Sequence, residues 1–151
     1  MKKTIVSLLL LIGFSANTIA QISYEAGIGT NYGGIVGVTV NSELNSNIEM
    51  FAGLGSGFET LTYVVGSKYW LNEQTRIIGN YGYNCTVKTV STSTTYKDYY
   101  GFNFGIGYSF GGKNSNGVAI DLMLLDTSDC HDAVGSSEPS SAIRIALGYR
   151  F

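Results

Sequence analysis

The amino-acid sequence predicts an all-β protein, an eight-stranded antiparallel up-and-down β-barrel. Three observations lead to this prediction: apolar and small or polar residues alternate in eight segments after residue 20, turn-forming residues separate the segments, and none is as long as a membrane-spanning helix. Successive side chains of a strand point to opposite faces, so each segment has one bulky apolar face and one narrow polar face. An even number of such strands can close into a barrel without free sheet edges.

The last segment, residues 141–151, is predicted to close the barrel. It reads SAIRIALGYRF and ends on an aromatic residue. Its bulky face consists of Ile143, Ile145, Leu147, Tyr149 and Phe151. Its narrow face consists of Ala142, Arg144, Ala146, Gly148 and Arg150.

The other seven segments show the same sidedness. Their ranges are 22–30, 34–41, 48–55, 60–71, 75–87, 100–110 and 118–124. Val64 and Trp70 depart from the pattern, because they place large apolar groups on the narrow face. Residues 31–33, 42–47, 72–74 and 111–116 are predicted turns, and the Thr/Ser-rich stretch 88–95 and the polar stretch 126–140 are predicted loops.

Residues 1–20 form a predicted secretory signal peptide. Lys2 and Lys3 give a basic start, residues 5–14 an apolar run, and Ala16 to Ala20 a small-residue exit, with cleavage expected after Ala20. The alternative, a membrane-anchoring helix, is disfavoured because the run is about half of the ~20 residues needed to span a bilayer. The barrel domain is therefore expected to comprise residues 21–151.

The sizes of the side chains on the two faces indicate which face points outward. The interior of an eight-stranded barrel is just wide enough to be filled by side chains, and the narrow faces are mostly Gly, Ala, Ser and Asn. A water-soluble barrel would carry many Lys and Glu residues outside, whereas the bulky faces are Ile, Leu, Val, Tyr and Phe. The sequence thus predicts a transmembrane barrel, and export places it in a bacterial outer membrane, in contact with lipid and lipopolysaccharide. Aromatic residues near the strand ends suggest interfacial girdles: Tyr69, Tyr108, Phe110, Tyr149 and Phe151 at one rim, and Tyr83, Tyr99 and Tyr100 toward the other.

Two cysteines are expected near the extracellular rim. With both termini on the periplasmic side, the loops 88–95 and 126–140 lie outside, close to Cys85 and Cys130. Export implies an oxidising compartment. Two alternatives follow: a Cys85–Cys130 disulfide over the barrel mouth, or two unpaired thiols.

Six charged residues are predicted to face the interior, in the strand halves nearer the periplasm. They are Glu25, Glu49, Lys68, Arg76, Asp121 and Arg150. Charges in a narrow, poorly hydrated lumen are costly unless they are paired. We therefore expect a salt-bridge network that plugs the barrel, with a gated small pore as the functional alternative to a filled core.

The remaining composition offers little support for other chemistry. Without Lys2 and Lys3, seven basic residues remain against eleven acidic ones, a formal charge of 7 − 11 = −4. This charge does not suit binding to nucleic acid.

The single histidine, His131, could join Ser128, Asp132 or Ser136 in an acyl hydrolase, and Asp126, Asp129 and Asp132 could hold Ca²⁺. A solvated loop is the preferred interpretation of both groups, and no cofactor or metal is expected.

The eight segments and the ending Gly148-Tyr149-Arg150-Phe151 resemble the OmpX/Ail family and, more loosely, the OmpA membrane domain and opacity-type porins. The resemblance implies a monomeric, non-enzymatic outer-membrane protein whose Tyr149 and Phe151 are part of the signal read by the insertion machinery. It also implies a structural or adhesion-type role toward a host or cell-surface ligand, here through residues 88–99 and 126–140. A narrow channel for ions or small solutes is the alternative function, and a lipid A-modifying acyl hydrolase is a weaker one.

Overall fold

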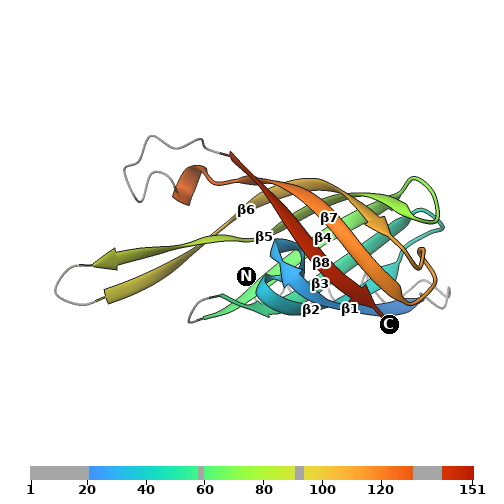
Figure 1. Cartoon of the computed structure of the whole chain (residues 1–151), viewed down its shortest axis with the longest axis horizontal. Helices are drawn as coiled ribbons and strands as arrows, with labels where there is room; N and C mark the ends of the chain where they lie inside the picture. Colours follow the sequence, from blue (N-terminus) through green and yellow to red (C-terminus); the bar gives the residue numbers. More distant parts are fainter. Residues whose placement is uncertain (1–20, 58–59, 91–93, 131–140) are drawn as a thin grey trace, which may run out of the picture.

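The alternating segments form eight strands that close into one barrel (Figure 1). The computed structural model describes residues 21–57, 60–90, 94–130 and 141–151, so the predicted signal peptide and residues 131–140 of the predicted outer loop lie outside the described residues. The elements are β1 (Ile22–Gly29), the 3-10 helix η1 (Thr30–Tyr32), β2 (Gly34–Glu43), β3 (Ile48–Ser56), β4 (Leu61–Trp70), β5 (Thr75–Val90), β6 (Thr94–Ser109), β7 (Gly117–Asp126) and β8 (Ser141–Arg150).

Each strand pairs with its neighbours in the sequence, and β1 pairs with β8 to close the barrel. All these pairings are antiparallel. The predicted eight-stranded antiparallel up-and-down barrel is therefore confirmed. The closing pair is in register from Glu25 opposite Arg150 to Ile28 opposite Leu147.

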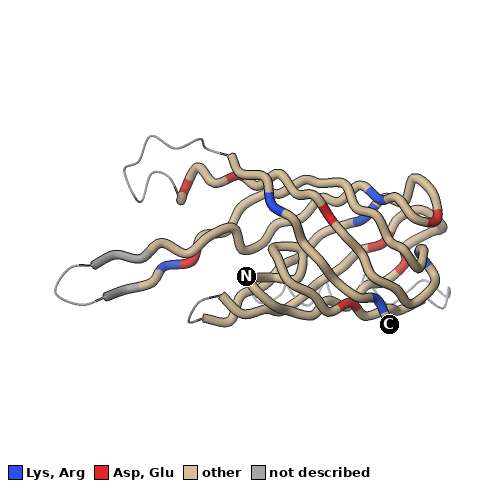
Figure 2. The backbone as a smooth tube through the Cα atoms, viewed as in Figure 1, with Lys and Arg blue, Asp and Glu red and all other residues tan. Residues whose placement is uncertain are grey.

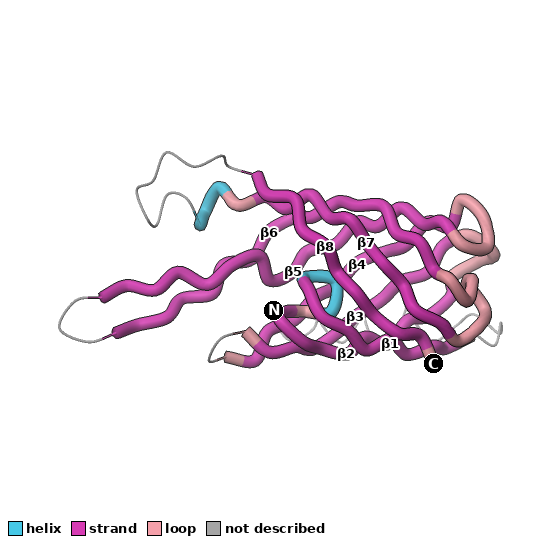
Figure 3. Tube along the Cα trace, viewed as in Figure 1, coloured by secondary structure: helices cyan, strands magenta, loops and turns pink. Residues whose placement is uncertain are grey.

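The two ends of the barrel differ. The turns 44–47, 71–74 and 110–116 lie at the end near Arg150, which we call the turn end (Figure 3). The opposite end, which we call the arm end, carries η1 and a long extension of β5 and β6 that projects past the barrel wall (Figure 1).

This extension corrects the predicted loop at residues 88–95. Strands β5 and β6 pair as far as Val90 and Thr94. Pairing of β4 with β5 ends at Gly82, and pairing of β7 with β6 ends at Asn103, so the described parts of 83–102 form a two-stranded hairpin that we call the arm. The loop prediction was wrong because it weighted the polarity of threonine, whereas β-branched Thr and Val residues favour strands.

The barrel has its apolar side chains outside and its charged side chains inside. Large apolar residues on every strand are exposed, for example Ile143 at 71% and Phe104 at 62%, whereas Arg76 is 0% exposed. Val64 and Trp70 are both buried in the interior, as their positions in the alternation require, and Val64 packs in one cluster with Phe51. Charged residues are sparse along the barrel wall (Figure 2).

The connection between β1 and β2 folds into the barrel as η1, which the sequence prediction of a simple turn missed. Thr30, Asn31 and Tyr32 are all buried. The Tyr32 ring lies over the paired residues Gly27 of β1 and Gly148 of β8, and a Cβ at either glycine would overlap the phenol. The chain leaves η1 through Gly33, whose φ of 86° lies in the left-handed region that favours glycine. The first connection thus fills the lumen.

Candidate functional site

The six charged residues predicted to face inward meet in one layer of the interior, toward the turn end. Each side chain is at most 4% exposed. The members are Glu25 on β1, Glu49 on β3, Lys68 on β4, Arg76 on β5, Asp121 on β7 and Arg150 on β8. We call this group the ionic layer.

Glu25 lies at the centre of the ionic layer. Its Oε1 atom is 2.9 Å from Lys68 Nζ, 3.1 Å from Arg76 Nη1 and 2.6 Å from Arg150 Nη2. A single carboxylate therefore binds the cations of three different strands. Its loss would leave three buried positive charges around one neutral side chain.

The other two carboxylates complete the ionic layer on either side. Arg150 Nη2 is 2.7 Å from Glu49 Oε1, and Trp70 Nε1 donates to Glu49 Oε2 at 2.9 Å. Arg76 Nη2 donates to both oxygens of Asp121, at 3.0 and 3.1 Å. The layer contains three acids and three bases, so its formal charges cancel.

The Trp70 ring packs among the cations of the ionic layer. The guanidinium carbons of Arg76 and Arg150 lie 5.4 and 5.2 Å from its centroid. Lys68 Nζ lies 4.9 Å from the centroid of Phe51. Aromatic faces attract cations most strongly away from water, so inward aromatic residues that look misplaced in the sequence support the charges.

An amide chain continues the filling from the ionic layer toward the arm end. Asn31 Nδ2 donates to Asp121 Oδ2 at 2.8 Å, Asn80 Nδ2 to Asn31 Oδ1 at 2.8 Å, and Asn103 Nδ2 to Asn80 Oδ1 at 3.0 Å. Beside this chain lies a buried apolar cluster: Phe51, Val64, Ile78, Met123 and Leu125. Ionic, amide and apolar side chains thus pack the described interior.

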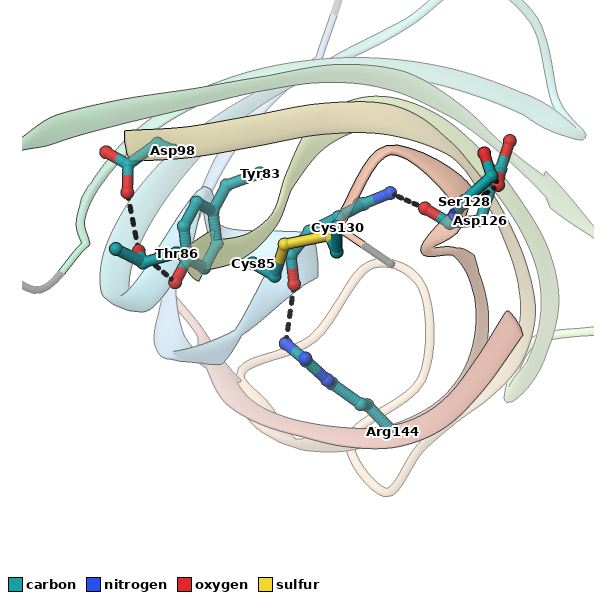
Figure 4. The surroundings of a disulfide bond; sticks show 9 residues. Tyr83, Cys85, Thr86, Asp98, Asp126, Ser128, Cys130 and Arg144 are labelled. Atoms are coloured by element: carbon teal, nitrogen blue, oxygen red, sulfur yellow. Dashed lines mark hydrogen bonds between the residues drawn. A yellow bond between two sulfur atoms is a disulfide. The ribbon is translucent and has the colours of Figure 1, made fainter. Parts of the chain in front are cut away.

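A disulfide between Cys85 and Cys130 joins the base of the arm to the segment that follows β7 (Figure 4). The sequence left open whether the two cysteines are bonded or unpaired, and in the structure they are bonded. A second link comes from β8, because Arg144 Nη1 donates to the carbonyl oxygen of Asn84 at 2.7 Å. Asn84 is the extra residue of a bulge, since the register passes from Tyr83 opposite Tyr100 to Cys85 opposite Tyr99.

The bulge also changes the position of Tyr83. The sequence placed this residue on the outer face near a rim, but the structure buries it at 5% exposed. Its hydroxyl shares a hydrogen bond of 2.9 Å with the Thr86 hydroxyl. Tyr100 instead stacks on Tyr63 of β4, with ring centroids 4.7 Å apart.

Asp98 on the arm fastens β6 to two other segments. The Thr86 and Thr60 hydroxyls donate to its two carboxylate oxygens (Thr86 to Oδ1, Thr60 to Oδ2). Thr60 immediately precedes β4. The arm base is therefore held by a disulfide, an aromatic stack and several hydrogen bonds.

Of the residues considered for an acyl hydrolase, the structure describes Ser128, which forms local hydrogen bonds with Asp126. Ser128 donates to Asp126 Oδ1 through its hydroxyl at 2.7 Å and its backbone N–H at 3.1 Å. His131, Asp132 and Ser136 lie outside the described residues. Within the described ranges, no group of three or more His, Cys, Asp and Glu residues is placed to hold a metal ion.

Tyr149 and Phe151, the predicted insertion signal, lie on the outer face at the turn end. Both are exposed, and their rings pack edge to face with centroids 5.1 Å apart. In the part of the chain that the structure describes, no helix is long and apolar enough to cross a membrane.

Comparison with known proteins found no matching family model, no matching curated protein and no matching solved structure. The distribution of side chains and the arm are therefore the features from which a function can be inferred. Sequence reasoning brought the six charged residues and the two cysteines forward, but it missed Asn31, Tyr32 and Arg144. The run Asn31-Tyr32-Gly33-Gly34 gives no sign of whether a turn folds inward or outward.

Proposed function

We propose that this chain is an exported, integral outer-membrane β-barrel protein of a bacterium, whose outer face lies against lipid. One observation supports this proposal most directly: exposed large apolar side chains surround the barrel, while Glu25, Arg76 and Asp121 are buried inside it. In water such an outer face would be an unusually large apolar patch. In a bilayer it is the required arrangement, because a closed barrel satisfies its backbone internally.

The distribution of aromatic residues supports the same placement. At the turn end, Tyr108 packs edge to face with Phe110 and Tyr149 with Phe151, each with centroids 5.1 Å apart. Toward the arm end, Tyr63 stacks on Tyr100. Amphipathic rings favour the two membrane interfaces. With the ending Gly148–Phe151, these rings favour an OmpX/Ail-like protein that presents Tyr149 and Phe151 to the insertion machinery.

The proposed role is non-enzymatic and is either structural or a surface interaction with a host or cell-surface ligand. The arm is the support for the second possibility, since it projects beyond the barrel and its base is locked by the Cys85–Cys130 bond (Figure 1). A rigid base reduces the entropy lost when a projecting surface binds a partner. We further propose that the protein acts as a monomer, surrounded by lipopolysaccharide and phospholipid.

The packed interior favours this role over a narrow channel. The ionic layer, the amide chain and Tyr32 occupy the described lumen. We expect planar-bilayer recordings of the refolded chain to lack a large, stable conductance. Such a conductance would instead support the channel alternative.

The role of the arm can be tested without disturbing the barrel. Replacing residues 87–97 by Asn-Gly joins Thr86 to Asp98, which are paired in the hairpin, through a favoured two-residue turn. This variant should keep heat-modifiable gel mobility and outer-membrane fractionation, and it should lose binding to cells or extracellular matrix. The matched control removes the side chains of Asn45 and Ser46 at the turn end, which should leave binding intact. Binding that survives arm removal would contradict the surface-interaction role, and fractionation with soluble proteins would contradict the membrane proposal itself.

A further inference from the structure

The barrel wall has a cleft at the arm end, beside the seam between β1 and β8. The two strands pair only from Glu25 to Ile28 on β1, because β1 ends at Gly29 and the chain turns inward as η1. Residues 141–146 of β8 extend further and pair with β7 alone. Tyr83, Cys85 and Thr86 of β5 also line this opening, and Arg144 donates to the carbonyl oxygen of Asn84 on the same strand. A cleft of about 480 Å³ remains, within the usual size range of ligand pockets.

The walls of the cleft differ in polarity. The outer wall is formed by Ile28, Ile35 and Ile145, which are 52%, 47% and 65% exposed. The inner wall carries hydrogen-bonding groups: Thr30, Tyr83, Thr86 and Arg144. A ligand that fills the cleft therefore needs one polar end and one apolar end.

Among the described residues, two groups on the inner wall can form further hydrogen bonds. Arg144 makes one hydrogen bond among the described residues, from Nη1, and no described carboxylate is within ion-pairing distance of it. Thr30 is 2% exposed, and its hydroxyl oxygen is buried without a hydrogen-bond partner. A buried polar atom without a partner is costly, and a ligand that bonded the Thr30 hydroxyl would remove that cost.

We propose that this cleft binds the carboxylate head of a single-chain fatty acid. The head would lie against Arg144 and Thr30, and the acyl chain would pass along Ile28, Ile35 and Ile145 onto the outer face. A single guanidinium matches a monoanionic, planar carboxylate in charge and shape. The inference takes the lipid-facing outer surface from the proposed function, because that surface receives the chain.

The test titrates [1-¹³C]dodecanoate into the full chain refolded in neutral maltoside micelles and follows the carboxyl ¹³C resonance. Arg144→Gln should weaken binding by about tenfold or more, which corresponds to loss of a charge-assisted contact. Thr30→Val should weaken binding by about threefold while leaving the thermal midpoint unchanged or higher, since the hydroxyl has no partner in the free protein. Lys97→Gln, which removes an exposed cation of the arm, is the control and should bind like the unmodified chain.

Two further probes separate the head from the chain. Dodecanol keeps the chain without the charge, and acetate keeps the charge without the chain, so both should bind at least about tenfold more weakly than dodecanoate. Equal binding of either probe, or unchanged affinity in both Arg144→Gln and Thr30→Val, would overturn the proposal. The two failures are distinguishable. A barrel that inserts into micelles but does not bind dodecanoate refutes fatty-acid binding at the cleft and leaves the membrane proposal standing, whereas a barrel that is soluble without detergent refutes the proposed location.

Discussion

Glu25 and Arg150 stand directly opposite each other on the two strands that close the barrel, and Arg150 Nη2 lies 2.6 Å from Glu25 Oε1. The backbone extends the same seam, because the Phe151 N–H donates to the Tyr24 carbonyl oxygen at 2.9 Å. The closure of the sheet and the centre of the ionic layer therefore coincide. A change in one of these residues affects both the seam and the lumen.

Glu25→Gln should lower the free energy of unfolding by about 3 kcal/mol or more, because removing one partner of a buried ion pair leaves uncompensated charge. The measurement is reversible urea unfolding in lipid vesicles, followed by the fluorescence of Trp70, the single tryptophan. Glu73→Gln, in the exposed turn 71–74, is the matched control and should stay within about 0.5 kcal/mol. The double variant Glu25→Gln/Lys68→Met restores charge balance and should recover much of the loss. Equal stability of Glu25→Gln and the unmodified chain would show that the layer tolerates a net charge.

Tyr32→Ala should cost about 3 kcal/mol or more, as expected for an aromatic side chain removed from a packed interior. Tyr32→Phe should cost less than about 1 kcal/mol, because the Tyr32 hydroxyl lies as far as 3.5 Å from Glu25 Oε2. The same unfolding assay distinguishes the two. If the Phe variant lost as much stability as the Ala variant, the hydroxyl and not the ring volume would hold η1 inside.

The outward apolar face can be tested by comparing two arginine substitutions. Leu122, in the middle of β7, and Leu61, at the start of β4, are both exposed, at 48% and 76%. In a bilayer, Leu122→Arg should cost about 2–4 kcal/mol and Leu61→Arg about 1 kcal/mol or less, because the cost of a charge depends on its depth. Equal and negligible costs in vesicles would contradict the membrane placement.

Removing the disulfide should loosen the arm while the barrel stays closed. The cysteines are 45 residues apart, for which the chain-entropy account gives an upper value of about 4 kcal/mol. Cys85→Ser/Cys130→Ser should therefore be less stable, and amide exchange in 83–102 should accelerate more than in β2 and β3. Gel migration after alkylation should differ with and without reductant in the unmodified chain only. Identical migration of the unmodified chain under both conditions would mean that the thiols are unpaired.

The alternation of bulky and small residues predicted the barrel correctly, because successive side chains of a strand point to opposite faces of the wall. The same rule placed Glu49, Lys68 and Arg76 inside, since each occupies a narrow-face position of its strand. It also explains why Val64 and Trp70 were not exceptions. Val64 packs with Phe51 in the apolar cluster, and the Trp70 ring packs against the guanidinium groups of Arg76 and Arg150.

The features missed from the sequence depend on local geometry that alternation does not encode. The bulge at Asn84 breaks the period, so Tyr83 is buried although its position in the pattern places it outside. The inward fold of η1 depends on space left by Gly148 on a strand 116 residues further along the chain from Tyr32 (148 − 32). The arm was missed because the polar threonines suggested a loop, whereas threonine favours the extended conformation of a strand.

The position of η1 has a consequence for the order of assembly. The Tyr32 ring lies on the inner face of the barrel over the paired glycines Gly27 of β1 and Gly148 of β8, so we expect it to reach its site before or while these strands pair. Because β8 follows the other seven strands in the sequence, its pairing with β1 is the longest-range contact of the barrel and forms at a high entropic cost. The β1–β2 hairpin thus carries, in η1, side chains that occupy the lumen, and we expect the later strands to assemble around them.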